Sequence, residues 1–262
     1  MRGKVFIVGA GPGDPELITV KGLKLLRRAE VVLYDHLVNE AILREVPPET
    51  PKVYVGKVAG HHSVKQEEIN RLLVESADKG LTVVRLKGGD PFIFGRVGEE
   101  MEFLREKGVP YEVVPGVTAA SALASRGEFS LTHRGYSSLL TFVTGHRKGN
   151  GPLRLPFSSL AKLGGTLVVY MGLGALEELR DGLLSEGMEP HTPVMLGRKV
   201  GWPDERLLVT TLENMVNLRE REGLTPPVLV VIGRVVESVP FLHGIAASTT
   251  KSGLIEIGRE KE

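Results

Sequence analysis

The chain of 262 residues contains no cysteine, a single tryptophan and only 5% aromatic residues. Without thiols it can form neither a disulfide nor a thiolate-held metal centre. Its formal net charge is only +1, so it lacks the overall positive field that attracts nucleic acid. No apolar run approaches the roughly 18 residues that a membrane span needs. These absences predict a protein that binds neither nucleic acid nor membranes.

The beginning of the chain also lacks the core of a secretory signal. Met1–Lys4 leads into a short apolar run at residues 5–8, whereas a signal core needs about 7–15 apolar residues. We therefore expect a cytoplasmic protein. The content of 42% hydrophobic and 25% charged residues is ordinary for a globular protein, and the length suits one large domain or two moderate ones.

The first half of the chain alternates short apolar runs with stretches of helical spacing. Strands are expected at residues 5–8, 31–34, 52–55, 81–86 and 111–114. Helices are expected at residues 15–29, 41–45, 65–79 and 97–107. This order is typical of a wound, mainly parallel α/β sheet.

The dipeptide Pro115-Gly116 interrupts this order, and a second series of elements follows it. Helices are expected at residues 118–125 and 175–186, and strands at residues 139–144, 167–171, 194–196 and 228–232. The predicted fold class is α/β, with an N-terminal α/β domain over residues 1–115 and a C-terminal α/β domain over residues 118–243. Residues 244–262 are expected to form a tail of low order.

A glycine-rich turn, Gly9–Asp14, follows the first predicted strand. A dinucleotide-binding fingerprint would need its third glycine where this chain has Asp14. Pro12 removes a backbone donor, and the charge of Asp14 would repel a pyrophosphate. A neutral or cationic ligand, such as the sulfonium of S-adenosylmethionine, suits the turn better. A tight strand–helix turn that binds nothing explains it equally well.

A second glycine-rich turn, Lys87–Phe92, follows a strand in the same way. Its two glycines would let a ligand approach the backbone closely, at the strand end where open α/β sheets bind ligands. Asp14 and Asp90 each precede a proline, and both are predicted to start helices. Beyond the turn, Arg96 would lie beside Glu99 on a helix, where a solvated ion pair is the simpler interpretation.

Basic and histidine-containing segments are weaker signals. Leu131–Arg134 and Gly145–Lys148 are basic and lie near predicted strand or turn ends. His61 and His62 are adjacent, so they would not share a helix face, and no acidic cluster has the spacing of metal ligands. No metal site is predicted.

Six segments together resemble the uroporphyrinogen-III C-methyltransferases of the tetrapyrrole methylase superfamily. They are Gly9–Thr19, Gly88–Arg96, Pro115–Ala120, Leu131–Arg134, Val143–His146 and Tyr170–Leu173. They occur in the family's order, and the similarity extends over about residues 3–240. The resemblance implies two α/β domains of the tetrapyrrole methylase type, with the cofactor in the cleft between them, and a homodimer.

The resemblance also implies a reaction. Members of this family transfer methyl groups from S-adenosylmethionine to carbons 2 and 7 of uroporphyrinogen III. The product is precorrin-2, formed via precorrin-1, for sirohaem or cobalamin biosynthesis. Because this substrate carries several carboxylates, a local basic patch is expected on a chain that is otherwise nearly neutral.

The family's functional positions can be carried over residue by residue. The cofactor positions would be Pro12, Gly88, Gly89, Asp90, Ile93, Thr118, Ala119, Met171 and Val200. The resemblance makes Asp35 the proton acceptor and Lys57 the proton donor. It ties Arg96, Glu99 and Arg134 to the substrate.

The chain departs from the family pattern in places that keep alternatives open. Val97 replaces a glycine of the second signature. The segment Trp202–Glu205 resembles the precorrin-4 methyltransferases, so a later corrin precursor such as precorrin-4 is the alternative substrate. Val200 stands where a glycine contacts the cofactor, so it could serve only through its backbone. A dinucleotide-binding protein without catalysis is a further alternative, which Asp14 opposes.

Overall fold

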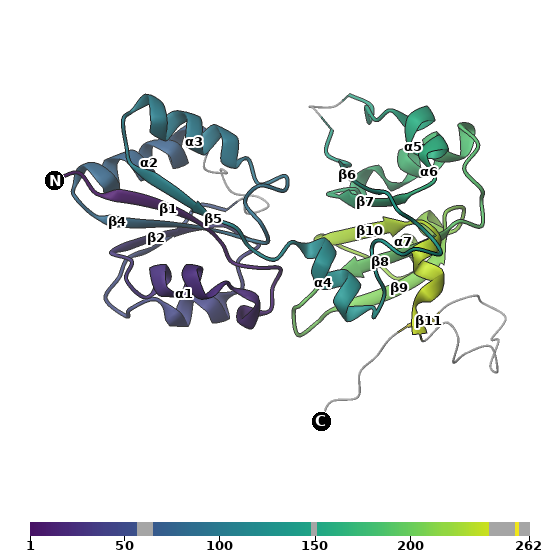
Figure 1. Cartoon of the computed structure of the whole chain (residues 1–262), viewed down its shortest axis with the longest axis horizontal. Helices are drawn as coiled ribbons and strands as arrows, with labels where there is room; N and C mark the ends of the chain where they lie inside the picture. Colours follow the sequence, from purple (N-terminus) through teal and green to yellow (C-terminus); the bar gives the residue numbers. More distant parts are fainter. Residues whose placement is uncertain (57–64, 148–150, 241–254, 257–262) are drawn as a thin grey trace. The chain divides into compact units, whose positions relative to one another are not determined.

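The computed structural model describes residues 1–56, 65–147, 151–240 and 255–256. Lys57, His61, His62 and all of the 244–262 tail except residues 255 and 256 lie outside this description. The chain divides into two compact units, Met1–Ala119 and Ala120–Glu262 (Figure 1). Each unit combines one sheet with helices, which confirms the predicted α/β class. Within the described residues no helix is long and apolar enough to cross a membrane.

The sheet of the first unit is entirely parallel, with strand order β3-β2-β4-β1-β5. Its strands are β1 Lys4–Gly9, β2 Val31–Tyr34, β3 Lys52–Tyr54, β4 Thr82–Lys87 and β5 Tyr111–Val114. Because parallel strands all end at the same edge, the segments that follow them gather there. That edge is where an open α/β sheet binds its ligands.

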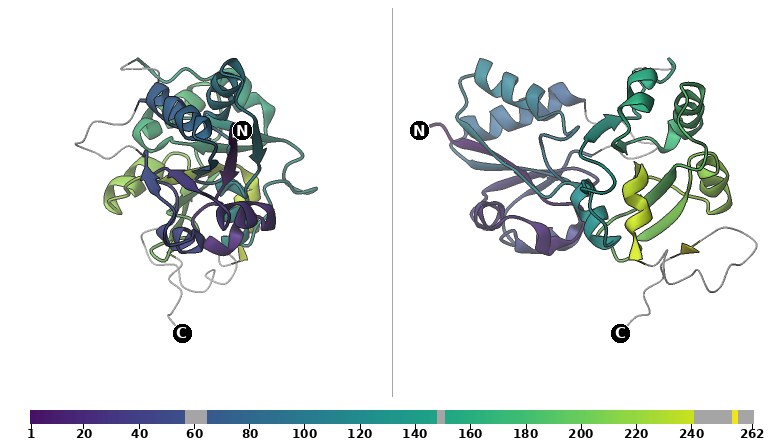
Figure 2. Two further views of the ribbon diagram at one scale, coloured as in Figure 1. Left: turned by 90° about the vertical axis from the view of Figure 1, so that its left-hand side faces the viewer. Right: turned by 45° about the vertical axis from the view of Figure 1, so that its right-hand side comes forward.

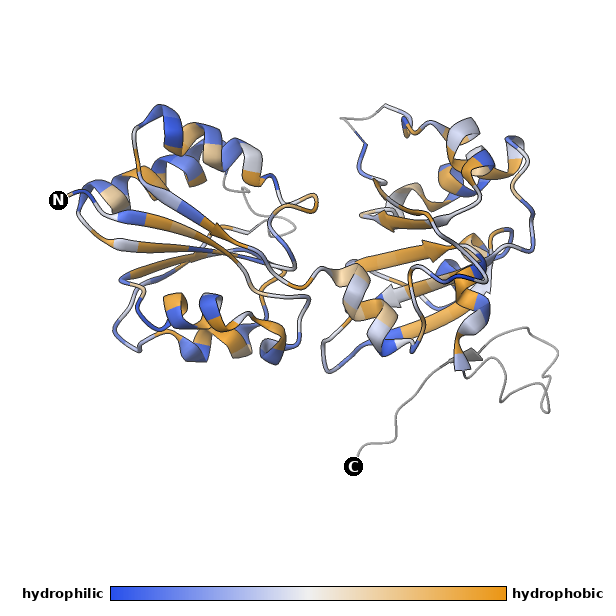
Figure 3. Cartoon of the chain, in the orientation of Figure 1, coloured by the Kyte–Doolittle hydropathy of each residue, from blue (hydrophilic) through white to orange (hydrophobic). Residues whose placement is uncertain are grey.

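Helices cover both faces of this sheet (Figures 1 and 2). One face carries α1 Val20–Leu26 and η2 Glu40–Glu45, and the other carries α2 Gln66–Asp78 and α3 Val97–Glu106. Two apolar cores result, because successive residues of a strand point to opposite faces. Ile7 of β1 belongs to the core beneath α2 and α3, and its neighbour Val8 to the core beneath α1. Figure 3 shows these strands as mostly hydrophobic and the helices as mixed.

Two local predictions in this unit need correction. The helix expected at residues 15–29 is two pieces, η1 Pro15–Leu17 and then α1, because Thr19 is extended and caps α1 by accepting the Gly22 N–H at 3.1 Å. Asp14 does cap the first piece and accepts the Glu16 N–H at 2.9 Å. Asp90, in contrast, starts no helix, and α3 begins only at Val97.

The second unit has a mixed sheet, with strand order β11-β9-β8-β10-β7-β6. Its strands are β6 Leu140–Thr144, β7 Thr166–Tyr170, β8 Pro193–Arg198, β9 Arg206–Thr211, β10 Val228–Ile232 and β11 Ile255–Glu256. Among the described strands of this sheet, only β6 and β7 pair in parallel. Since β10 runs antiparallel to both β7 and β8, strands β6, β7 and β8 all end at one edge. The sequence patterns did not reveal β9, which follows a polar turn.

Helices lie on both faces of this second sheet. They are α4 Ala119–Arg126, η3 Leu173–Ala175, α5 Phe157–Leu163, α6 Leu176–Ser185, α7 Met215–Arg221 and η4 Arg234–Ser238. Helices α5, α6 and α7 share one apolar core, to which Leu160, Leu179 and Met215 contribute. On the opposite face α4 approaches β8 so closely that a Cβ at Gly197 would lie 2.5 Å from Leu123 Cδ1.

Candidate functional site

The turns that follow β1, β4 and β5 are tied together at the carboxyl edge of the first sheet. Gly89 donates its N–H to the Gly11 carbonyl at 2.7 Å, and Gly11 donates back to Gly89 at 3.3 Å. Gly116, after β5, donates its N–H to Asp90 Oδ2 at 3.0 Å. The two signature turns are therefore one structural feature, joined by backbone hydrogen bonds.

Close backbone packing explains the glycines at this edge. A Cβ at Gly9 would lie 2.7 Å from the Cα of Gly116, and one at Gly116 would lie 2.3 Å from the Gly89 carbonyl oxygen. Gly89 differs from both. Its φ is +67°, and a Cβ there would meet nothing within 4 Å. Gly89 thus presents bare backbone towards open space, as a ligand-binding turn requires.

The predicted cofactor residues of this unit lie on that edge or directly follow it. Asp90 accepts the N–H of Phe92 at 2.8 Å through Oδ1, so its carboxylate joins two turns. Pro12 is buried in the first turn and Ile93 is half-buried in the second. Gly88 packs against Leu37, whose Cβ lies 2.5 Å from where a Gly88 Cβ would be. The remaining two positions, Thr118 and Ala119, lead from the β5 turn into α4.

Asp35, the predicted proton acceptor, follows β2 at the same edge. Its Oδ1 accepts the N–H of Leu37 at 3.2 Å and that of Gly88 at 3.4 Å, and its Oδ2 accepts from Arg85 at 3.3 Å. Both oxygens of the carboxylate thus accept hydrogen bonds, and about 25% of the side chain is exposed. Burial and the Asp35 charge raise the pKa of Tyr54 nearby.

Beneath Asp35 lies a group of buried charges that the sequence analysis did not single out. Arg85 and Lys87 point from β4 towards Glu100 of α3, and each donates to Glu100 Oε1 at 3.1 Å. Glu100 is fully buried, and Gln66 of α2 donates to the same oxygen at 3.3 Å. Two cations within the central strand of a parallel sheet are unusual. This feature of the sequence could have indicated the buried cluster.

Each charge in this cluster depends on the other charges around it. Burial lowers the pKa of Lys87, and repulsion from Arg85 lowers it further, against the opposing attraction of Glu100 and Asp35. Glu100 Oε2 has no hydrogen-bond partner among the described residues. The charges of the two cations balance those of the two carboxylates, so removing any one of them would leave an uncompensated buried charge.

Arg96 and Glu99, both tied to the substrate by the resemblance, pair with each other. Arg96 adopts a left-handed φ of 57° just before α3. It donates to Glu99 through Nε at 2.8 Å and through Nη2 at 2.5 Å. About half of each side chain is exposed. The ion pair raises the pKa of Arg96 and lowers that of Glu99.

The predicted residues of the second unit do not all share one edge of its sheet. Met171 follows β7 with a φ of 54° and is 51% exposed. Val200 follows β8 at that edge, but its side chain is buried, which leaves only its backbone for a ligand. Arg134 is exposed and belongs to the turn His133–Ser137, which precedes β6. It therefore lies towards the other end of β6, away from Met171.

The turn after β8 is held by ion pairs. Glu205 accepts from Arg126 of α4 at 2.9 Å and from the Gly201 N–H at 2.7 Å. Asp204 accepts from Lys199 at 2.7 Å, and the Lys199 ammonium lies 5.8 Å from the centroid of the Trp202 ring. The Trp202–Glu205 segment, where the chain departs from the family pattern, thus has an internal structural role.

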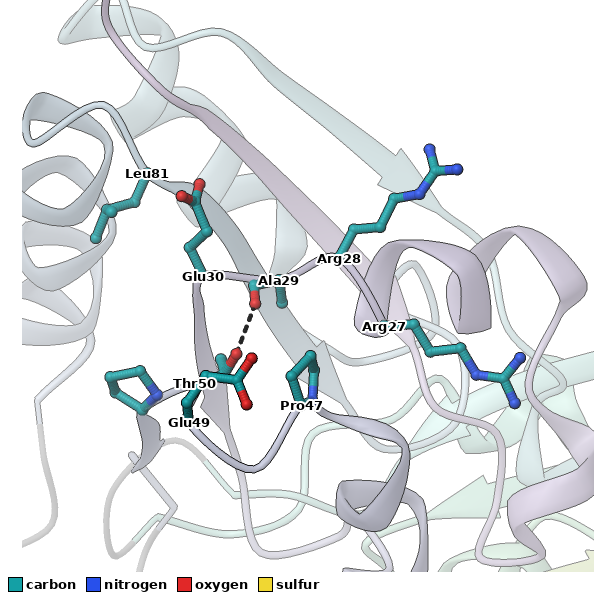
Figure 4. A pocket seen from close by; sticks show the side chains of 9 residues that line it. Arg27, Arg28, Ala29, Glu30, Pro47, Glu49, Thr50 and Leu81 are labelled. Atoms are coloured by element: carbon teal, nitrogen blue, oxygen red, sulfur yellow. Dashed lines mark hydrogen bonds between the residues drawn. The ribbon is translucent and has the colours of Figure 1, made fainter.

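A hollow of about 460 Å³ lies at the opposite edge of the first sheet, where β2 and β4 begin (Figure 4). Two of its polar side chains already have partners: Thr50 donates to the Ala29 carbonyl at 2.8 Å, and Glu30 accepts the Thr82 N–H at 2.7 Å. The guanidinium groups of Arg27 and Arg28 point away from Thr50. This hollow is separate from the glycine-rich edge and offers no converging reactive groups.

Among the residues that the structure describes, no group of three or more histidine or acidic side chains could hold a metal ion.

A family model describing tetrapyrrole (corrin/porphyrin) methylases matches residues 4–216. The chain belongs to the tetrapyrrole methylase family. The two-sheet α/β fold is that of a tetrapyrrole methylase.

Two relatives of this tetrapyrrole methylase are named for their activities. It is 47% identical over 235 residues to a siroheme synthase from Vesicomyosocius okutanii, covering 90% of this chain and 50% of the relative. It is 45% identical over 240 residues to a chloroplastic S-adenosyl-L-methionine-dependent uroporphyrinogen III methyltransferase from Arabidopsis thaliana, covering 91% and 65%. The chain thus spans about half to two thirds of the length of these relatives.

Two solved structures are also similar to this tetrapyrrole methylase. A uroporphyrin-III C-methyl transferase from Thermus thermophilus, complexed with S-adenosyl homocysteine, has a TM-score of 0.76 at 45% identity, covering 90% of this chain and 99% of that one. A cobalt precorrin-4 methyltransferase of cobalamin biosynthesis has a TM-score of 0.80 at 32% identity, covering 89% and 95%.

Proposed function

We propose that this tetrapyrrole methylase transfers methyl groups from S-adenosylmethionine to carbons 2 and 7 of uroporphyrinogen III. The product would be precorrin-2, formed via precorrin-1, for sirohaem or cobalamin biosynthesis. The observation that carries the proposal is the identity of 45% to a plant enzyme named for this substrate, over 91% of the chain. The enzyme would be a cytoplasmic homodimer, which size-exclusion chromatography and cell fractionation would test.

The glycine-rich edge of the first unit suits S-adenosylmethionine. Gly89 offers bare backbone to open space, and a ligand there would find peptide groups rather than side chains. Asp14 and Asp90 are acidic, so the edge would tolerate a cationic sulfonium better than a phosphate. The solved relative with S-adenosyl homocysteine supports the same class of ligand. The residues carried over for this role come from both units, and those of the second rest on the family motif.

When bound, the sulfonium supplies an electrophilic methyl group. The pyrrole carbon would attack this methyl with its own electron pair, the carbon–sulfur bond would break, and sulfur would keep that bond's electrons. The protein's main contribution is to hold the two reactants at about 3–3.5 Å and in line. A proton must then leave the tetrapyrrole, and the partly exposed carboxylate of Asp35 would accept it. Lys57 would be the proton donor.

Substrate carboxylates would bind to arginine. Arg134 is exposed, and guanidinium groups bind carboxylates in a planar, two-point geometry. Arg96 already donates two hydrogen bonds to Glu99. A substrate carboxylate would therefore bind the remaining nitrogen of Arg96 or displace Glu99. Neither arginine would act as a base, because a guanidinium stays protonated in proteins.

A later corrin precursor such as precorrin-4 is the second candidate substrate. Two observations favour it: the TM-score of 0.80 to a cobalt precorrin-4 methyltransferase, and the Trp202–Glu205 segment. Against it stands the lower identity of 32%, compared with 45% for the uroporphyrin-III enzyme. If precorrin-4 is the substrate, uroporphyrinogen III should accept no methyl group.

One experiment separates the candidates. The protein is incubated anaerobically with S-adenosylmethionine and either uroporphyrinogen III or precorrin-4. Mass spectrometry then gives the number of methyl groups added to each product. The proposal expects two methyl groups on uroporphyrinogen III and none on precorrin-4. The reverse result would establish the second candidate. Binding of NAD without binding of S-adenosylmethionine, measured by calorimetry, would instead indicate a dinucleotide-binding protein.

A further inference from the structure

We propose that Arg85 is a positioning residue that orients the Asp35 carboxylate from within the buried charge cluster of Arg85, Lys87 and Glu100. This inference rests on the proposed function, because it assumes that Asp35 accepts the substrate proton. None of the six segments that carry the family resemblance includes Arg85.

Arg85 is built into the sheet rather than attached to its surface. Its side chain is 4% exposed, and it lies on the central strand β4, next to β2, which Asp35 directly follows. It donates through Nη1 to the carbonyls of Leu86 at 3.0 Å and Leu33 at 3.4 Å. Through Nε it donates to Glu100 at 3.1 Å. These contacts leave Nη2 aimed at Asp35 Oδ2, 3.3 Å away.

The rigid fork of the guanidinium makes this arrangement directional. Because the five N–H groups are coplanar, contacts that hold one side of the fork determine where the other side points. Glu100 and the two carbonyls hold Arg85 on three sides, so its fourth direction is set before any substrate arrives. Asp35 is then clamped between the fork and the backbone N–H groups of Leu37 and Gly88. About a quarter of its side chain stays exposed.

The surroundings of Asp35 contain further charged or titratable groups on several elements. Lys87 lies on β4 with Arg85, Tyr34 ends β2, and Tyr54 ends β3. Tyr34 and Tyr54 pack edge to face with ring centroids 5.5 Å apart. A change in activity alone could therefore come through several groups. The test must isolate the link between Arg85 and Asp35.

The test is a double-mutant cycle between the cluster and Asp35. Arg85→Met alone would leave Glu100 under-compensated, so it is combined with Glu100→Gln, which keeps the charge balance with Lys87 and Asp35. This paired variant is compared with Asp35→Asn and with the combination of all three changes. The matched control is Arg206→Met with Glu222→Gln, which removes a 2.6 Å ion pair of the second unit in the same way.

Methyl transfer to uroporphyrinogen III is measured with S-adenosylmethionine binding and thermal melting. The paired variant should lose about tenfold or more in kcat, with KM and S-adenosylmethionine affinity within about twofold. In the Asp35→Asn background it should cause less than about a twofold further loss, because the group being oriented is already gone. Full kcat in the folded paired variant would overturn the proposal. So would losses that multiply, since these would indicate general structural damage.

Two further measurements keep the test decisive. If the paired variant does not fold, Arg85→Lys keeps the charge but not the fork and should show the same loss in kcat. A crystal structure of Arg85→Lys should show the Asp35 carboxylate moved away from the Gly88 N–H, whereas an unmoved carboxylate would overturn the positioning role. This structural result does not depend on activity. If Asp35→Asn retains full methyl transfer, the proton-acceptor role in the proposed function fails instead.

Discussion

Gly11 and Gly89 exchange two backbone hydrogen bonds, with N···O distances of 2.7 and 3.3 Å, and so join the turns after β1 and β4. The two segments are far apart in the chain but adjacent at the sheet edge. The bonds leave the Gly89 Cα facing open space. This relationship turns two sequence signatures into a single surface on which a ligand could lie.

Gly89→Val should abolish binding of S-adenosylmethionine. The branched side chain would occupy the open space beside the backbone. The backbone φ of +67° at this position would also cost about 1–2 kcal/mol of stability for an L residue. Calorimetric titration with S-adenosylmethionine and a melting curve measure both effects. Gly98→Ala is the control, because a Cβ there also meets nothing within 4 Å, and it should bind normally. Normal affinity in folded Gly89→Val would remove this turn from the site.

Gly116→Ala should destabilise the first unit. The added Cβ would lie 2.3 Å from the Gly89 carbonyl oxygen, which is backbone and cannot rotate away. Overpacking of this kind costs roughly 1–3 kcal/mol, so chemical denaturation should show an earlier transition. Gly174→Ala, where nothing lies within 4 Å of the new Cβ, should leave the midpoint nearly unchanged. Equal midpoints for both variants would contradict the close packing.

Asp14→Ala should weaken folding more than cofactor binding. The carboxylate caps η1 by accepting the Glu16 N–H at 2.9 Å, and loss of such a cap costs about 0.5–2 kcal/mol. Asp14→Asn keeps the accepting oxygen and should recover most of the stability. Thermal melting and S-adenosylmethionine titration distinguish the roles. Unchanged melting together with a collapse of affinity would show that Asp14 serves the ligand rather than the turn.

Glu112 should contribute stability that disappears in acid. Hydrogen bonds from Lys21 and then Lys4 lower the pKa of this carboxyl from its usual 4.5 to about 2. Folding therefore favours the ionised form, and the contribution is complete above about pH 4.5 and is lost as the pH falls towards 2. Because the ion pairs are partly exposed, we expect less than about 1 kcal/mol. The difference in unfolding free energy between the native chain and Glu112→Gln, followed from pH 7 to pH 2, should shrink in that window. A constant difference would contradict it.

Arg96→Leu and Arg134→Leu test the proposed substrate contacts separately. Each change removes a charge-assisted hydrogen bond worth roughly 1.5–3 kcal/mol, so kcat/KM should fall about tenfold to a hundredfold or more. Affinity for S-adenosylmethionine should persist, because a cationic sulfonium gains nothing from a nearby cation. Titration with S-adenosylmethionine measures the affinity of each variant for the cofactor, and methyl-transfer assays measure kcat/KM. Intact transfer would reduce the arginine in question to a surface charge, and loss of cofactor binding would assign it to the cofactor or the fold.

The sequence by itself determined the α/β class and the two glycine turns, because strand and helix periodicity and the geometry of glycine are local properties. It predicted β2, β5 and β10 with their observed bounds, and it identified the cap at Asp14. Local pattern misled at Asp90, whose carboxylate is used by the distant Gly116 instead of a helix.

Tertiary structure alone decided which charges far apart in the chain meet. Arg85 and Lys87 come from β4 and Glu100 from α3, and only the packing of α3 on the sheet places Glu100 3.1 Å from each of the two cations. It also separated Arg134 from Met171, since the loop before β6 and the end of β7 lie towards opposite ends of those strands. The physical reason is that electrostatic and packing partners are chosen by proximity in space, which a single sequence does not encode locally.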